Sequence, residues 1–138
     1  MAVRPLYLAD KSALARLGHK GVAGRLGPLL VEGLVATCPV IDLEVLYSAR
    51  SLAHYEAILA ERRALPCLPL TKEITDRAID VQHRLARKGQ HRLALPDLLI
   101  AAVGEINDLT VVHYDADYDR IAEISGQRVE WVVPRGSI

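Results

Sequence analysis

The 138-residue chain contains no phenylalanine, and aromatic residues make up only 4% of it. A hydrophobic core must therefore be filled by Leu, Val, Ile and Ala. Hydrophobic residues still account for 51% of the sequence, which excludes the composition of intrinsically disordered chains. We expect a single domain covering residues 1–138, because the length suits one domain and no repeat or linker divides it.

A long apolar run is also missing. No segment approaches the roughly 20 consecutive apolar residues that span a bilayer. The N-terminal stretch "MAVRPLYLAD" has neither the apolar core nor the cleavage site of a secretory signal. We therefore expect a cytoplasmic protein that makes no membrane contact.

Cysteines are scarce, and the two present, Cys38 and Cys67, have no metal-ligand spacing around them. This pattern disfavours a zinc site, and a disulfide is not expected in the cytoplasm. We predict that both cysteines are small reduced residues of the core.

Net charge is absent as well, since 17 Lys and Arg residues balance 17 Asp and Glu residues. The chain as a whole therefore exerts no electrostatic attraction on nucleic acid. Any contact with nucleic acid must come from a local basic patch or through metal ions.

Short apolar segments alternate with segments of helical periodicity. The predicted strands are 5–10, 34–41 (with Pro39 opening a helix), 66–70, 110–114 and 128–133. The predicted helices are 11–18, 22–32, 40–63 as two helices, 72–89 after the N-cap Thr71, 95–108 and 116–126. This alternation predicts an α/β fold: a three-layer α/β/α sandwich with a short parallel sheet.

Acidic residues stand at the ends of these apolar elements. Asp10 and Asp115 each follow a predicted strand, and ligands of open parallel sheets bind beyond the carboxyl ends of strands. Asp97 opens an almost wholly apolar helix, and Glu44 lies among apolar neighbours. Each has a structural alternative: a helix cap for Asp10 and Asp115, a helix-dipole partner for Asp97, and a surface position for Glu44. A functional site is favoured because all four acids occur together in one chain.

A site made only of carboxylates selects hard cations, chiefly Mg²⁺ or Mn²⁺, and is a poor match for zinc. One or two such ions could activate a water and stabilise the leaving oxygen of a phosphodiester. Without metal, the same carboxylates would repel one another, and some would be protonated near neutral pH.

Four segments, "YLADKSAL", "IDLEVLYSA", "LPDLLIAAVG" and "VVHYDADYDRIA", occur in this order and together resemble the PIN-domain ribonucleases, in particular the VapC-type toxins of bacterial toxin–antitoxin pairs. The resemblance covers nearly the whole chain. It implies an α/β/α sandwich and a metal-dependent endoribonuclease whose RNA cleavage inhibits translation and growth. It also implies an antitoxin partner of the VapB type, and a homodimer or a toxin–antitoxin hetero-oligomer.

The resemblance assigns roles to individual residues. It implies catalytic and metal-binding roles for Asp10, Glu44, Asp97 and Asp115, with Asp117 as a further metal ligand. Glu44 would be either a ligand of a second ion or the group that orients the attacking water. Ser12 would hydrogen-bond a carboxylate or a water close to the substrate. Asp119 is left as a helix-dipole residue or a supporting group.

Basic residues gather in the segment "RLARKGQHR", residues 84–92. Arg87 and Arg92 are candidate contacts to substrate phosphates beside the acidic crevice. The alternative is a cationic helix end that complements the helix dipole. His113, on a predicted strand, fits a buried structural residue better than a catalytic base.

Two other functions compete with this interpretation. One is a catalytically silent PIN-like module that only binds RNA or a protein partner. The other is a phosphotransferase of the haloacid dehalogenase type, which needs a second Asp two residues after the first, where this chain has Ser12. The sequence does not identify the RNA that is cut, the number of metal ions or the antitoxin.

Overall fold

A computed structural model describes residues 4–138 of the chain. Four strands form one parallel sheet in the order β2-β1-β3-β4. The strands are β1 (Tyr7–Ala9), β2 (Val35–Ala36), β3 (Thr110–His113) and β4 (Val129–Trp131). In the centre of the sheet, Leu8 of β1 lies opposite Val111 of β3. All four carboxyl ends therefore point toward the same edge, as the functional crevice requires.

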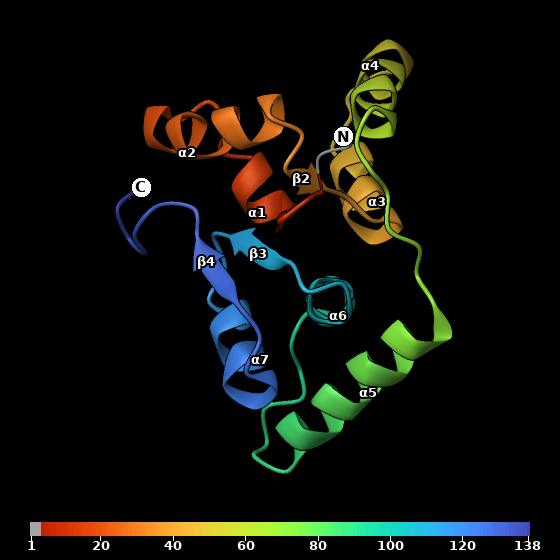
Figure 1. The fold of residues 1–138 in the computed structure, drawn as a ribbon, viewed down its shortest axis with the longest axis vertical. Coiled ribbons are helices and arrows are strands. Elements are labelled where there is room, and N and C mark those ends of the chain that lie inside the picture. The colour runs from red at the N-terminus through yellow and green to blue at the C-terminus, as the bar shows by residue number, and fades with distance from the viewer. Residues whose placement is uncertain (1–3) are drawn as a thin grey trace.

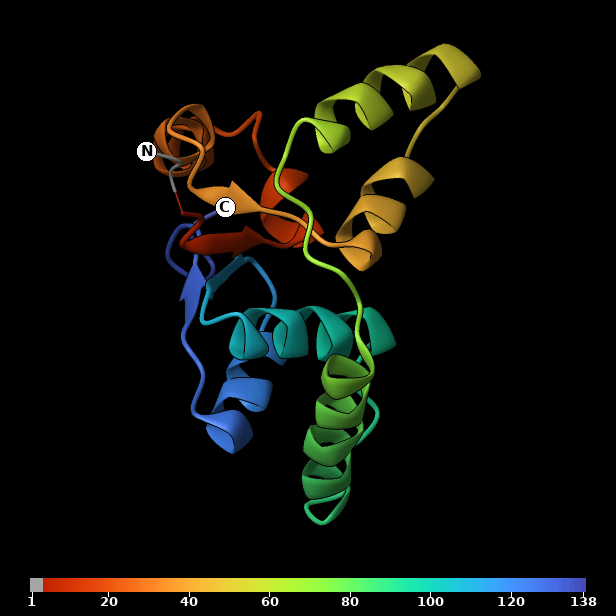
Figure 2. The ribbon, with the colours of Figure 1, turned by 45° about the vertical axis from the view of Figure 1, so that its right-hand side comes forward.

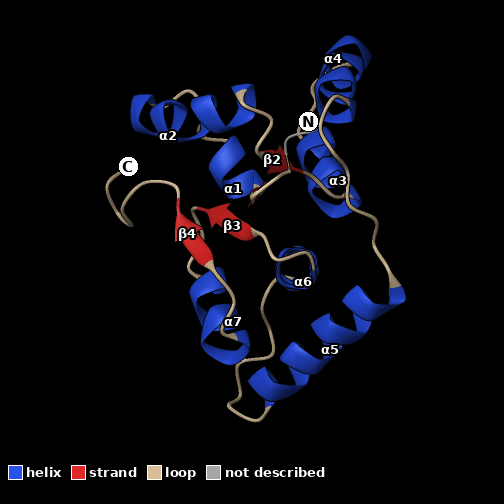
Figure 3. Ribbon diagram, viewed as in Figure 1, coloured by secondary structure: helices blue, strands red, loops and turns tan. Residues whose placement is uncertain are grey.

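Residues 4–138 form seven helices, and helices cover both faces of the sheet (Figures 1 and 3). They are α1 (Lys11–Leu14), α2 (Lys20–Val31), α3 (Pro39–Tyr47), α4 (Leu52–Arg63), α5 (Lys72–Ala86), α6 (Leu95–Ile106) and α7 (Asp117–Ser125). Buried residues of α1 and α2 pack on one face of the sheet, and those of α3, α5, α6 and α7 pack on the other. The predicted three-layer α/β/α sandwich is therefore confirmed.

Helix α6 is the central helix of the larger layer, because α3, α5 and α7 all pack against it. It lies directly on β3, and glycine at position 104 makes this possible. A Cβ atom there would sit 2.7 Å from the Cγ2 atom of Val111, which is closer than real contacts allow. This close contact places the N-terminal end of α6, with Asp97, next to the carboxyl edge of the sheet.

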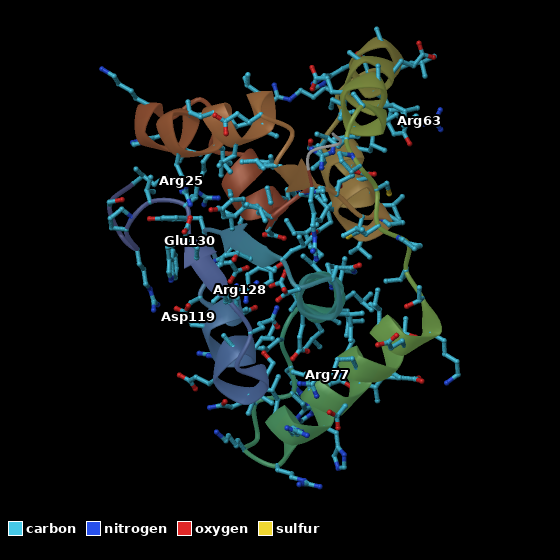
Figure 4. The ribbon with its side chains drawn as sticks, in the orientation of Figure 1. Arg25, Arg63, Arg77, Asp119, Arg128 and Glu130 are labelled. Atoms are coloured by element: carbon cyan, nitrogen blue, oxygen red, sulfur yellow. The ribbon has the colours of Figure 1, made fainter. Side chains whose placement is uncertain are left out.

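Ion pairs tie the helices to one another and to the sheet (Figure 4). Arg25 of α2 lies 2.8 Å from Glu130 of β4, and the two are bonded through both carboxylate oxygens of Glu130. Arg77 of α5 binds Glu105 of α6 at 2.6 Å. The predicted apolar stripe of α5 faces the core as expected, and Thr71 accepts the capping hydrogen bond from the Ile74 amide.

Two predictions about the chain were wrong. Residues 66–70 do not form a strand; this segment touches the sheet only through an isolated bridge between Thr37 and Cys67. Pro66 and Pro69 lack the amide hydrogens that would extend the pairing. In consequence Cys67 is exposed, whereas Cys38 is buried as predicted, and both are free thiols.

Helix α4 packs on α3 and projects away from the sheet (Figure 2). Its one buried residue is Arg62, whose guanidinium binds Asp42 at 3.0 Å and the hydroxyl of Thr37 at 2.8 Å. Among residues 4–138, no helix is long and apolar enough to cross a bilayer.

Candidate metal centre

Asp10 follows β1 and caps α1, so the capping alternative is correct for this residue. Its Oδ2 atom accepts hydrogen bonds from the amide of Ser12 at 3.0 Å and from the Ser12 hydroxyl at 2.6 Å. Its Oδ1 atom accepts from the hydroxyl of Tyr118 at 2.8 Å. The side chain is thus buried with three donors around it, and a capping role alone accounts for only one of them.

Asp97 lies in the first turn of α6 and is only 5% exposed. Its Oδ2 atom has no hydrogen-bond partner within residues 4–138. Burial, followed by the charges of Asp10 and Asp115, raises the pKa of Asp97 to about 8. A helix-dipole partner in the first turn can remain in solvent, so the dipole alone does not account for a carboxylate buried to this extent.

Asp115 and Asp117 lie at the junction of β3 and α7. The amide of Asp117 donates to the Oδ1 atom of Asp115 at 3.0 Å, which fixes the turn into the helix. Asp97, Asp115 and Asp117 each offer one carboxylate oxygen, and these three atoms all lie within 4.8 Å of one another. Residues from two different helices and a connecting turn therefore converge on one point.

Glu44 approaches the same region from α3 and is half-buried. Burial raises its pKa, and the negative charges of Asp10 and Asp115 raise it further, which places Glu44 within electrostatic reach of both. It lies outside the group of three converging oxygens. The fold thus brings all five predicted acids to the carboxyl edge of the sheet, as a tight trio with Asp10 and Glu44 beside it.

The residues present suit a divalent cation. A buried, unpartnered carboxylate oxygen is costly unless something positive compensates it, and Asp97 Oδ2 is such an atom. The three candidate ligands are all carboxylates, which hard cations such as Mg²⁺ and Mn²⁺ prefer and zinc does not. The mutual repulsion that raises the pKa of Asp97 would be relieved by a bound cation.

Two further residues support this site: Tyr118, which no sequence pattern singled out, and His113, which was predicted as a buried structural residue. Tyr118 occupies an apolar position of α7, where an aromatic ring reads as core, and its hydroxyl reaches Asp10 and comes within 3.5 Å of Asp97. His113 is fully buried, and its Nδ1 atom accepts from the Asp115 amide at 3.1 Å. Burial lowers the pKa of His113, which agrees with a neutral structural histidine.

The predicted bond between Ser12 and a carboxylate is present, and the Ser12 hydroxyl also accepts from the Tyr114 amide at 2.8 Å. Asp119 does not join the acids; it accepts from the indole of Trp131.

Arg87, directly after α5, and Arg92, in the loop that leads to α6, are both exposed. No ion pair or hydrogen bond within residues 4–138 connects either of them to the acids, and their role in RNA binding stays a prediction.

The raised pKa of Asp97 predicts how the metal-free protein responds to pH. Folded Asp97 holds its proton up to about pH 8, whereas the unfolded chain releases it near pH 4, so stability is lost as the pH rises. Between pH 7 and 9 we expect the free energy of unfolding to fall by about 1 kcal/mol. Urea denaturation in the presence of a chelator measures this.

The matched control is Asp97→Asn, which has no proton to release and should show a flat profile over the same range. A wild-type protein that becomes more stable between pH 7 and 9, or a variant that keeps the slope, would contradict the assignment.

Comparison with known proteins agrees with this geometry. Residues 7–124 match the family model of the PIN domain. The ribonuclease VapC51 of Mycobacterium tuberculosis is 41% identical over 132 residues, covering 96% of both chains.

Two solved structures share the fold. One is VapBC2 from Rickettsia felis bound to promoter DNA, with a TM-score of 0.74 and 16% identity over 91% of this chain and 98% of that one. The other is VapBC-5 of M. tuberculosis, a member of the VapBC family of toxin–antitoxin systems, with a TM-score of 0.66 and 22% identity over 91% and 98%. The chain therefore belongs to the PIN-domain family and, within it, to the VapC ribonucleases.

Proposed function

We propose that this chain is an endoribonuclease toxin that hydrolyses RNA phosphodiesters with one or two Mg²⁺ or Mn²⁺ ions. The observation that carries the proposal is the convergence of three carboxylate oxygens within 4.8 Å, one of them from a buried carboxylate with an unpartnered second oxygen. Asp97, Asp115 and Asp117 would hold the ion, with Asp10 beside them. Membership of the VapC ribonucleases supports RNA as the substrate.

When bound, the ion would supply Lewis-acid chemistry, polarising a phosphoryl oxygen and lowering the pKa of a coordinated water. The other groups of the site serve orientation and proton transfer. Half-buried Glu44, whose pKa is raised, is suited to orient the attacking water or accept its proton. A role as ligand of a second ion is the alternative for this residue. Ser12, bonded to Asp10, keeps that carboxylate directed at the site.

Family membership also supports a VapB-type antitoxin as partner, in a toxin–antitoxin hetero-oligomer or with a toxin homodimer, and a cytoplasmic location. A single domain over residues 1–138 and RNA contacts by Arg87 and Arg92 belong to the same proposal. The competing function is a catalytically silent module that binds RNA or protein without cutting it.

Cleavage of a panel of structured and single-stranded RNAs, with and without EDTA, tests the proposal. We expect cleavage that EDTA abolishes and that added Mg²⁺ or Mn²⁺ restores, because the ion would both lower the pKa of the attacking water and stabilise the leaving oxygen. Cleavage that persists in EDTA would contradict the role of the metal. RNA binding without cleavage under any metal condition would favour the silent module.

A further inference from the structure

Among residues 4–138, Tyr118 is the one side chain within hydrogen-bonding distance of two of the acids, Asp10 and Asp97. It lies on α7, its ring is fully buried, and its hydroxyl donates to Asp10 Oδ1 at 2.8 Å across 108 residues of sequence. The same hydroxyl is 3.5 Å from Asp97 Oδ1. A buried tyrosine hydroxyl needs a partner, but a carbonyl or a water would serve equally well. The position of the Tyr118 hydroxyl between two carboxylates of one site indicates a function beyond satisfying its own hydrogen bond.

The Tyr118 hydroxyl can donate one hydrogen bond, and the shorter of its two distances identifies Asp10 Oδ1 as the acceptor. Among residues 4–138, the Asp10 carboxylate accepts two hydrogen bonds from Ser12 and one from Tyr118. The Oδ2 atom of Asp97 has no partner within the same residues. The two carboxylates therefore differ in their hydrogen bonding. Ser12 and Tyr118 fix the orientation of Asp10, whereas Asp97 has a free oxygen that can bind a cation.

The ring of Tyr118 is itself held in place. The His113 ring packs against it with centroids 4.9 Å apart, and Trp131 packs on His113 at 5.0 Å. The Trp131 indole is anchored to Asp119 by hydrogen bonds of 3.1 and 3.2 Å. A row of three rings thus extends from the end of β4 to the acids, and it restricts where the hydroxyl can lie.

We propose that Tyr118 is a positioning residue that holds Asp10 in the orientation required for metal binding. This inference rests on the proposed metal-dependent function. Donors that orient carboxylates around a metal typically contribute 10–100-fold to affinity, so the hydroxyl should matter without touching the ion or the RNA.

Tyr118→Phe removes the hydroxyl and keeps the ring. We expect Mn²⁺ to bind about 10-fold more weakly by calorimetric titration of the RNA-free protein. With saturating RNA, kcat at low Mn²⁺ should fall, whereas KM for RNA should not change. The matched control is Tyr114→Phe, because within residues 4–138 the Tyr114 hydroxyl bonds the backbone of Gly136 and Ile138 and none of the acids. It should bind Mn²⁺ as the wild type does.

A double-mutant cycle with Asp10→Ala identifies the group through which Tyr118 acts. In the Asp10→Ala background, Tyr118→Phe should change Mn²⁺ affinity by less than about two-fold, because the carboxylate it orients is gone. A 10-fold loss in both backgrounds would overturn the proposal, as would wild-type affinity in Tyr118→Phe.

If Tyr118→Phe does not fold, Ser12→Ala decides the question, since Ser12 donates to the same carboxylate from a position outside the core. Weaker Mn²⁺ binding by Ser12→Ala would support orientation of Asp10 as the requirement, and unchanged binding would refute it. Failure of the wild-type protein to bind Mn²⁺ or cleave RNA would instead remove the proposed function itself.

Discussion

Asp97→Asn should reduce RNA cleavage to background while making the metal-free protein more stable. Asp97 contributes to the trio of converging oxygens, and losing a metal worth several kcal/mol to the transition state slows the reaction by roughly 10³-fold or more. Stability moves the other way, because the amide removes a buried carboxylate whose pKa is raised to about 8 by burial and by its acidic neighbours.

The measurements are RNA cleavage at saturating Mg²⁺, Mn²⁺ titration and urea denaturation at pH 9. Asp76→Asn is the matched control, since Asp76 is exposed on α5 and its one ion pair among residues 4–138 is with Lys72 in the preceding turn. It should change none of the three quantities appreciably. Substantial cleavage by Asp97→Asn would remove Asp97 from the site, and a loss of stability would show that its charge is compensated in the metal-free protein.

Arg62→Ala should destabilise the protein by about 2–3 kcal/mol, which is a large effect for one residue of a peripheral helix. Arg62 is 7% exposed and binds both Asp42 and the fully buried Thr37. Removing one member of a buried ion pair leaves the other charge without compensation. The loss should be concentrated in α3 and α4, because Arg62 is the buried residue that joins α4 to the rest of the molecule.

The neighbouring substitution Arg63→Ala is the control, since Arg63 is exposed and points outward from α4 (Figure 4). It should change stability by less than about 0.5 kcal/mol. Thermal unfolding gives the difference between the two variants, and hydrogen exchange shows whether α3 and α4 open first. Equal stabilities of the two variants would mean that the buried pair contributes nothing net.

Much of the fold could be predicted because its signals are local. The alternation of apolar segments with helical periodicity located every strand of the sheet, and Thr71 and Pro39 marked helix starts correctly. The segment at 66–70 was misassigned because its apolar residues resemble a strand, while its two prolines prevent a regular ladder. Cys67 was misplaced for the same reason.

The site was predictable only in part. Acids at the ends of strands and at the head of an apolar helix indicated Asp10, Asp97 and Asp115, because the carboxyl ends of parallel strands share one edge. The sequence left each with a structural alternative, and for Asp10 the capping bond exists alongside its contact with Tyr118. The sequence indicated a structural role for His113 and did not single out Tyr118, because hydrophobic periodicity holds no information about where a buried hydroxyl points.

The sequence by itself determined the order of the elements and the chemical character of the site, because hydrophobic periodicity and residue type are properties of short segments. Tertiary structure decided which oxygens converge, which carboxylate stays unpartnered and which donors hold the others. Those features depend on contacts between segments as far as 108 residues apart, such as Tyr118 with Asp10. Side-chain direction across such distances is set by packing, which no local pattern records.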